Sequence, residues 1–139
     1  MLSFLVIVNF FCEVDINISA NLSARAAAVY RAIEDKKGEN TVVLDLRGLS
    51  SVTDILIVCN GHSDRHVQAL AENIQVEMKN QGVLPLGVEG LKAGSWILLD
   101  YGDIIVHIFH EPVRAFYDLE GIWSDAPRLE FSHGVLECS

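Results

Sequence analysis

The chain has 139 residues, and half of them are apolar, so it can form one domain with its own hydrophobic core. Ten Lys and Arg stand against nineteen Asp and Glu, which gives a formal net charge of −9 at pH 7. Direct binding to a nucleic-acid backbone needs a basic patch, and here the basic residues are few and spread along the chain. The acidic charge favours either a basic protein partner or solubility alone.

The cysteines and the N-terminal residues give information about the cellular compartment of the protein. Cys12, Cys59 and Cys138 are far apart and form no CxxC pair, so we expect a reducing compartment, no disulfide framework and no zinc site. Residues 1–12, MLSFLVIVNFFC, are too short to span a bilayer and lack the features of a secretory signal or an organellar transit peptide. We therefore expect residues 1–20 to be an apolar extension outside the fold of a cytoplasmic protein without membrane contact.

The first helix is predicted between residues 21 and 37. Apolar residues recur there at helical spacing in an alanine-rich stretch, with Asn21 or Ser23 as the N-cap and Gly38 after the end. The next segment, TVVLDL at 41–46, is typical of a strand.

A buried strand and a second helix follow the polar connection RGLSSVTD. The segment DILIVC at 54–59 is nearly all apolar, which predicts a central strand. Between residues 64 and 80, one apolar stripe predicts a helix that lies against the sheet; the stripe consists of Val67, Leu70, Ala71, Ile74 and Met78.

A short strand and a hairpin are predicted next. The segment VLPLGVEG at 83–90 suggests a short strand, and Pro85 argues for a sheet edge or a strand start. WILLDY at 96–101 and IIVHIF at 104–109 predict two strands that are joined by the turn Gly102-Asp103.

The last predicted helix begins at Glu111-Pro112, because Pro is favoured in a first turn. The tail from about residue 124 has little periodicity, and we expect it to be loose. The resulting order is α-β-β-α-β-β-β-α. It predicts an α/β single domain at 21–123, a mixed sheet of about five strands flanked by helices, and a C-terminal tail at 124–139.

The segment NGHSDRHV at 60–67 joins the central strand to the second helix and raises the question of an active site. A phosphate loop needs more glycines and a Lys, and a nucleophile elbow needs Gly at position 65, where this chain has Arg. Ser63 is better explained as the N-cap of the helix, with Asp64 favoured by the positive helix end.

Carboxylates and histidines are candidates for metal chemistry. Two of four aspartates at strand ends or turns could hold Mg²⁺, as in nucleotidyltransferase-type sites; the four are Asp45, Asp54, Asp100 and Asp103. The Asp-x-Asp spacing that puts two carboxylates on one strand face is missing. His107 and His110 point to opposite faces of a strand, so we expect no shared metal there.

The segment from Ser95 to Trp123 combines aromatic and acidic residues. It contains both tryptophans and two of the three tyrosines, and Arg114 is its one Lys or Arg. Aromatic anchors among acidic residues suit an interface with a basic protein. The alternative, that these aromatic side chains form the core of the hairpin and the last helix, stays open.

Three stretches resemble the ribosomal silencing factor family, also called the Iojap family. They agree with it in order and spacing over about residues 22–123, and they read VVLDLRGLSSVTDILIVCNGHSDRHVQALAENI, GVLPLGVEG and WILLDYGDIIVHIFHEPVRAFYDLEGIW. The resemblance implies an α/β domain similar to the nucleotidyltransferase fold, without its catalytic carboxylates. It also implies binding to the large ribosomal subunit through ribosomal protein number fourteen, which blocks association with the small subunit and represses translation.

The family's docking surface corresponds by position to the WILLDYGD segment. The resemblance implies contacts from seven residues, which are Trp96, Leu98, Asp100, Tyr101, Asp103, Tyr117 and Leu119. It implies no catalytic residue, no metal, no cofactor and no dependence on nucleic acid. It also suggests a homodimer off the ribosome, which an exposed edge strand would permit.

Two hypotheses of different classes therefore remain. The first is a silencing factor without enzymatic activity. The second is a divergent nucleotide- or metal-dependent enzyme that uses Ser63 and the strand-end carboxylates. His62 is a departure from the family, which usually has a small residue such as Thr at that position, and it leaves any fine role of this turn open.

Overall fold

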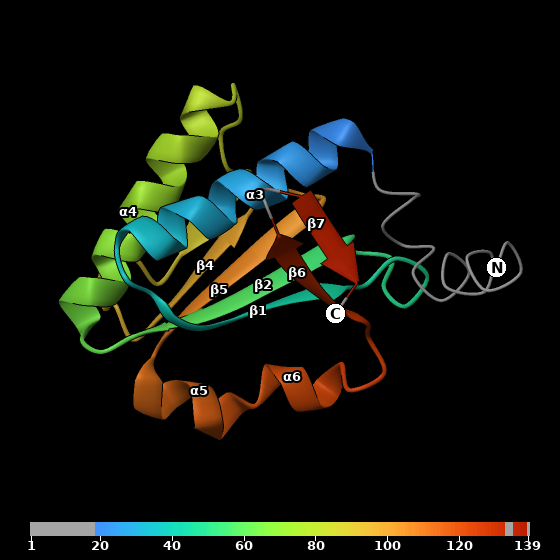
Figure 1. The fold of residues 1–139 in the computed structure, drawn as a ribbon. Helices are drawn as coiled ribbons and strands as arrows, with labels where there is room; N and C mark the ends of the chain where they lie inside the picture. Colours follow the sequence, from blue (N-terminus) through green and yellow to red (C-terminus); the bar gives the residue numbers. More distant parts are fainter. Residues whose placement is uncertain (1–18, 133–134, 139) are drawn as a thin grey trace, which may run out of the picture.

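A mixed sheet separates two unequal helical layers in the computed structural model, which describes residues 19–132 and 135–138 (Figure 1). The seven strands of the described chain are β1 (Glu39–Asp45), β2 (Ile55–Gly61), β3 (Gly87–Glu89), β4 (Trp96–Asp100), β5 (Ile104–His110), β6 (Arg128–Ser132) and β7 (Val135–Cys138). The helices are α3 (Ala20–Asp35), α4 (Asp64–Asn80), α5 (Glu111–Tyr117) and α6 (Leu119–Ile122). No helix in this described part is long and apolar enough to cross a membrane. The prediction for the N-terminal extension concerns residues that lie almost entirely outside the described ones.

The sheet has the order β3-β4-β5-β2-β1-β6-β7. Strands β2 and β5 pair in parallel, and the other neighbouring pairs are antiparallel. Every residue of β2 is buried, which confirms the prediction of a central strand from its apolar run. Strand β3 lies at an edge, as Pro85 indicates, because Pro cannot donate a hydrogen bond to a neighbouring strand.

Helix α3 begins at Ala20, before either of the predicted caps. Ser19 has an extended backbone, and its Oγ accepts a hydrogen bond from the Leu22 N–H at 3.1 Å. Ser19 is therefore the N-cap, and the prediction of Asn21 or Ser23 is wrong because both lie inside the first turns of the helix. Gly38 follows the helix, as predicted, and its N–H donates to the Ile33 carbonyl.

Helix α4 has the predicted bounds. The Ser63 Oγ accepts a hydrogen bond from the His66 N–H at 3.0 Å, and Asp64 lies in the first turn. The five residues of the predicted apolar stripe are all buried. Both observations confirm that NGHSDRHV begins a helix.

The β4–β5 hairpin is also confirmed. Gly102 has a φ of +85°, which favours glycine, and its N–H donates to Asp100 Oδ1 at 2.8 Å. The chain then enters α5 with Pro112 in the first turn. Asp118, in the left-handed region at φ +44°, separates α5 from α6.

The C-terminal segment corrects the prediction of a loose tail. Residues 128–132 form β6, which pairs with β1 through Val43↔Leu129 and Leu44↔Arg128, and β7 pairs with β6. Leu129 is buried, and the ring of Phe131 packs on that of Tyr30 with centroids 4.8 Å apart. Two alternating apolar residues therefore suffice for a short strand, and they are too few to show a periodicity.

Two hydrophobic cores lie on opposite faces of the sheet. The larger one packs α3 and α4 against residues such as Ile57, Leu99 and Val106. The smaller one lies under α5 and α6 and includes Leu44 and Phe109. Figure 1 shows the difference in size between the two helical layers. The smaller layer leaves part of its sheet face uncovered, and the candidate site lies there.

Candidate functional site

Strand β4 presents a different set of side chains on each face of the sheet. Ile97 and Leu99 are fully buried in the larger core. The alternate residues Trp96, Leu98 and Asp100 lie on the other face and remain partly exposed. Three of the seven predicted contact residues therefore share one surface.

Helices α5 and α6 cover this face only in part. They have 7 and 4 residues, and α5 packs on β5 and β2. Ile105, which is opposite Asp100 in the register, is also partly exposed. The sheet thus offers an open strip along β4 and its neighbour β5, which lies beside the short helices.

Aromatic rings cluster at one end of this strip. The Trp96 indole stacks on Phe109 with centroids 5.1 Å apart and contacts the Tyr117 ring at 4.4 Å. Phe109 is fully buried, whereas Tyr117, at the end of α5, is 45% exposed. The fourth predicted residue, Tyr117, therefore joins the surface, and the cluster has a buried base and an exposed top.

His107 holds the indole by a hydrogen bond. Trp96 Nε1–H donates to His107 Nδ1 at 2.9 Å, and the imidazole must be neutral at Nδ1 to accept it. Burial lowers the pKa of His107 from 6.5 to about 4, so the ring stays neutral at physiological pH. His107 was missed as a site residue, although its period-2 spacing from Phe109 places it on the same strand face.

Arg114 fixes α5 to the sheet below this cluster. It is buried, and its Nη1 donates to Asn60 Oδ1 at 2.9 Å and to the Asn40 carbonyl. Its Nε donates to Glu120 Oε1 at 3.1 Å. These contacts join α5 to β1, β2 and α6, and they place Tyr117 over Trp96. Sequence patterns give no signal for such a long-range contact.

Two carboxylates lie beside the apolar part of the strip. Glu89 is opposite Leu98 in the register of β3 and β4, so the two side chains share a face. Asp100 follows two residues after Leu98 on that face, and one of its oxygens binds the Gly102 N–H. The surface is thus aromatic at one end and acidic at the other.

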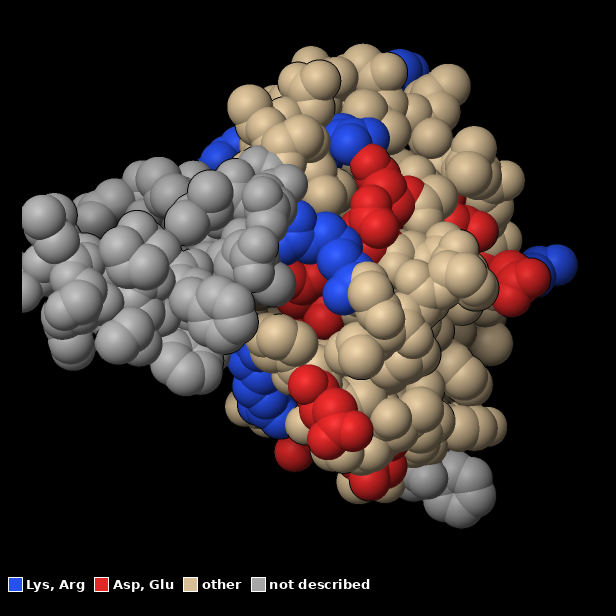
Figure 2. All heavy atoms as spheres, turned by 90° about the vertical axis from the view of Figure 1, so that its right-hand side faces the viewer, with Lys and Arg blue, Asp and Glu red and all other residues tan. Residues whose placement is uncertain are grey.

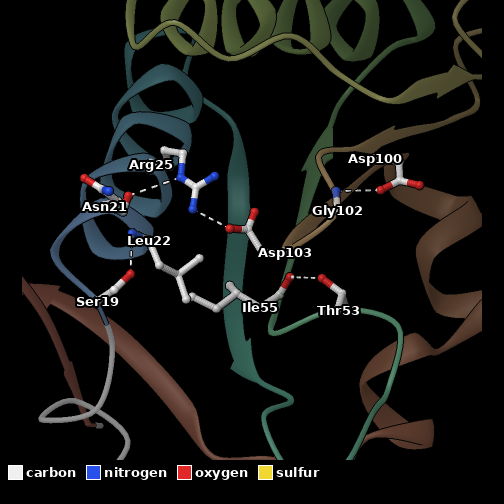
Figure 3. A network of polar contacts seen from close by, with 9 residues as sticks. All are labelled: Ser19, Asn21, Leu22, Arg25, Thr53, Ile55, Asp100, Gly102 and Asp103. Atoms are coloured by element: carbon white, nitrogen blue, oxygen red, sulfur yellow. Dashed lines mark hydrogen bonds and ion pairs between the residues drawn. The ribbon is translucent and has the colours of Figure 1, made fainter.

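The remaining predicted residues lie elsewhere. Tyr101 is 5% exposed and belongs to the larger core, on the opposite face of the sheet. Asp103 forms an ion pair with Arg25 of α3, as Figure 3 shows, and its carbonyl accepts from the N–H groups of Asp54 and Ile55. Leu119 is partly buried against the smaller core. Tyr101 and Asp103 therefore hold the hairpin against α3 and β2.

Four of the five residues of the enzyme hypothesis, Ser63, Asp45, Asp100 and Asp103, are engaged in structural contacts. Asp45 is buried and pairs with Arg47 at 3.1 Å, while Asp100 and Asp103 have the partners given above. The Ser63 hydroxyl caps α4. Among the described residues, no three His, Cys, Asp or Glu side chains lie close enough to share a metal ion.

The turn at NGHSDRHV connects three elements. His66 Nδ1 accepts from the His62 N–H at 3.1 Å, and its Nε2 lies 2.6 Å from the Lys36 carbonyl after α3. A Cβ on Gly61 would lie 2.9 Å from the Val67 nitrogen, so this position needs glycine. The segment joins β2, α4 and the end of α3, which is a structural role.

The fold and this surface define a single α/β domain with a partly exposed, aromatic and acidic strip on its sheet, a composition that suits an interface with another protein. A family model described as "Ribosomal silencing factor during starvation" matches residues 19–138. The chain belongs to this ribosomal silencing factor family.

Relatives and a solved structure agree with this assignment. The ribosomal silencing factor RsfS of Halalkalibacterium halodurans is 40% identical over 105 residues, which cover 76% of this chain and 89% of the relative. That of Bacillus subtilis is 38% identical over 104 residues, which cover 75% and 88%. A crystal structure of a protein from Chromobacterium violaceum superposes with a TM-score of 0.71 at 40% identity, covering 72% of this chain and 83% of that one.

Proposed function

We propose that this protein is a ribosomal silencing factor without enzymatic activity. It binds the large ribosomal subunit in the cytoplasm, blocks association with the small subunit and so represses translation. Membership of the family supports this function. The observation that carries the proposal is that Trp96, Leu98, Asp100 and Tyr117 lie together on the sheet face that α5 and α6 leave partly uncovered.

The proposed partner in the large subunit is ribosomal protein number fourteen. Glu89 and Asp100 lie on the same strip as the aromatic cluster, toward its other end, and the chain has a net charge of −9, so the surface attracts a basic protein. On the face of the molecule in Figure 2, the Lys and Arg of the described residues lie among Asp and Glu rather than in one patch. That face therefore shows no single basic patch of the kind that a phosphate backbone requires.

Trp96 is the proposed anchor of the interface. A large aromatic side chain that becomes fully desolvated on binding contributes most to affinity when its orientation is fixed beforehand. His107 and Tyr117 fix the indole in the free protein, by a hydrogen bond and by ring contact. His107 therefore acts as a positioning residue. It orients the Trp96 indole and does not itself contact the partner.

Silencing by this protein needs no chemical step. A protein bound where the two subunits meet excludes the small subunit by its volume alone. The degree of repression then follows the fraction of large subunits that are occupied, and so depends on the concentration of the protein relative to its Kd.

A homodimer off the ribosome is a further prediction. Strands β3 and β7 are the two edges of the described sheet, and edge strands can pair with another chain. Sedimentation equilibrium at several protein concentrations would detect a dimer. A mass that stays monomeric at every concentration would remove this prediction.

The test of the function is gradient sedimentation of purified ribosomal subunits under conditions that favour joining. We expect the wild-type protein to migrate with the large subunit and to reduce the joined fraction. The Trp96→Ala and Asp100→Arg variants should lose both effects and remain folded by circular dichroism. A matched control, Glu72→Arg on the exposed side of α4, should behave as wild type. If the wild type binds neither subunit, the proposal fails.

A further inference from the structure

A groove on the α3 side of the molecule has an aromatic floor and an acidic rim. It has a volume of about 330 Å³, and its lining residues are Ala27, Tyr30, Arg31, Glu34, Asp35, Glu77 and Phe131. Helices α3 and α4 and strand β6 supply these residues. The groove lies on the opposite side of the sheet from Trp96, so it is separate from the proposed ribosome-binding surface.

The floor of the groove is a pair of rings. Tyr30 and Phe131 lie with centroids 4.8 Å apart and planes inclined at 34°, and both side chains are partly exposed. The face of an aromatic ring carries negative potential, which attracts a cation that lies above it. Partly exposed rings in a concave site can therefore hold an ammonium or guanidinium group.

The rim adds negative charge that the described residues do not neutralise. Glu34, Asp35 and Glu77 form no ion pair with any described Lys or Arg, and Arg31 is the one basic residue of the lining. Burial, followed by the charges of Glu34 and Glu130, raises the pKa of Tyr30. The negative field therefore reaches the phenol at the floor.

We propose that this groove binds an arginine or lysine side chain from a basic segment of a protein partner. Charge complementarity selects this occupant, because the carboxylates attract the cationic head while the rings contact the apolar stem and the planar group. Residues 1–18 of this chain contain Glu13 and Asp15 and no Lys or Arg, so they cannot supply the side chain that the groove would bind. A second copy of the chain has a net charge of −9, so charge complementarity does not favour it as the occupant of this groove.

The test uses the full chain and blocked peptides in titration calorimetry. One peptide has four arginines separated by glycines, and the other has the neutral isostere citrulline in place of each arginine. We expect the wild-type protein to bind the arginine peptide and to show no measurable binding of the citrulline peptide. Equal binding of the two peptides, or none of either, would overturn the proposal.

Matched variants locate the binding on the chain. The groove pair, Glu34→Gln with Glu77→Gln, should weaken binding of the arginine peptide about tenfold, equivalent to about 1.4 kcal/mol. The control pair, Glu39→Gln with Glu72→Gln, removes the same charge outside the groove and should change binding less than about twofold. Equal weakening by the two pairs would show attraction by net charge without a site and would overturn the proposal.

The aromatic floor is tested separately. Tyr30→Leu keeps an apolar side chain but removes the ring, and it should also weaken binding of the arginine peptide. A thermal melt of each variant confirms that it is folded before binding is compared. Unchanged affinity in a folded Tyr30→Leu variant would contradict the role of the rings. Because the groove lies apart from Trp96, its failure leaves the proposed ribosomal function untouched.

Discussion

The two faces of the sheet are covered to different extents, and we propose that this difference separates the part of the molecule that provides stability from the part that binds. On one face, α3 and α4, with 16 and 17 residues, bury a large continuous core. On the other, α5 and α6, with 7 and 4 residues, bury a small one. Strand β4 contributes to both, because its alternate residues point to opposite sides. Neighbouring residues on one strand should therefore have different roles.

The largest expected effect on stability comes from the covered face. Leu99→Ala should lower the free energy of unfolding by about 3 kcal/mol, because it leaves a cavity in a fully buried core. Its neighbour Leu98→Ala lies on the open face and should cost less than about 1 kcal/mol. Denaturant titration measures both values. Equal losses would mean that the open face is as much a part of the core as the covered one.

The next largest effect is on ribosome binding. Trp96→Ala should weaken binding to the large subunit by about 2 kcal/mol or more, as for an aromatic hot spot. Leu98→Ala should also weaken binding to the large subunit, although this variant barely changes the stability of the protein. A substitution in the core, by contrast, should lower stability first. Fluorescence anisotropy of a labelled protein with large subunits gives the affinities. Full affinity in both variants would move the interface to another part of the molecule.

Charge on the open face should act mainly on the association rate. Asp100→Arg reverses the charge, whereas Asp100→Asn removes it and keeps an oxygen for the Gly102 N–H. We expect a large loss for the first variant, and for the second a smaller loss that shrinks as salt is added. Stopped-flow binding at several ionic strengths separates them. A salt-independent loss in Asp100→Asn would indicate that the hairpin turn, and not the charge, matters.

Titration of His107 should make stability depend on pH. Burial lowers the pKa of His107 to about 4, so between pH 6.5 and 4 the unfolded chain binds a proton that the folded one does not. Stability therefore falls as the pH drops through this window, by up to about 1.4 kcal/mol per pH unit from this residue. His107→Gln keeps an acceptor for Trp96 and removes the titration. Its unfolding free energy should fall less than that of wild type over this range, and parallel curves would contradict the assignment.

The smallest expected effect is at Ser63 of NGHSDRHV, which caps α4 on the covered face of the sheet. Ser63→Ala removes the cap of α4 and should cost about 1 kcal/mol of stability without changing ribosome binding.

Saturating ATP, CTP or Mg²⁺ should leave the Tm of the wild type unchanged. A ligand that binds the folded state raises the Tm, and we expect none of these three to bind. A clear rise in Tm would revive the enzyme hypothesis for Ser63 and the strand-end carboxylates.

Local patterns predicted most of the fold. The bounds of α4 follow from a strong cap at Ser63 and five apolar residues on one stripe, which act within the helix itself. The cap of α3 was predicted wrongly because Ser19, Asn21 and Ser23 are all suitable caps by residue type. The extended backbone of Ser19, which makes it the cap, is visible only in the structure. Strand β6 was missed because its pairing with β1 and β7 and the ring contact of Phe131 with Tyr30 stabilise it from outside its own sequence.

The candidate surface was predictable only in part. Alternation along β4 is enough to group Trp96, Leu98 and Asp100, and the same rule places Tyr101 on the opposite face. The approach of Tyr117 to Trp96 was not predictable from spacing. It depends on Arg114, which reaches across to Asn60 on β2, and no local pattern reports a contact between residues so far apart in sequence.

Hydrogen exchange of the protein with and without large ribosomal subunits tests the open face most directly. We expect amide groups of β3, β4 and the end of α5 to exchange more slowly in the complex. Glu72 and its neighbours on the exposed side of α4 should exchange at unchanged rates. Protection that is absent from β3 and β4, in a complex that sedimentation shows to be formed, would contradict the claim that the uncovered sheet face binds the ribosome.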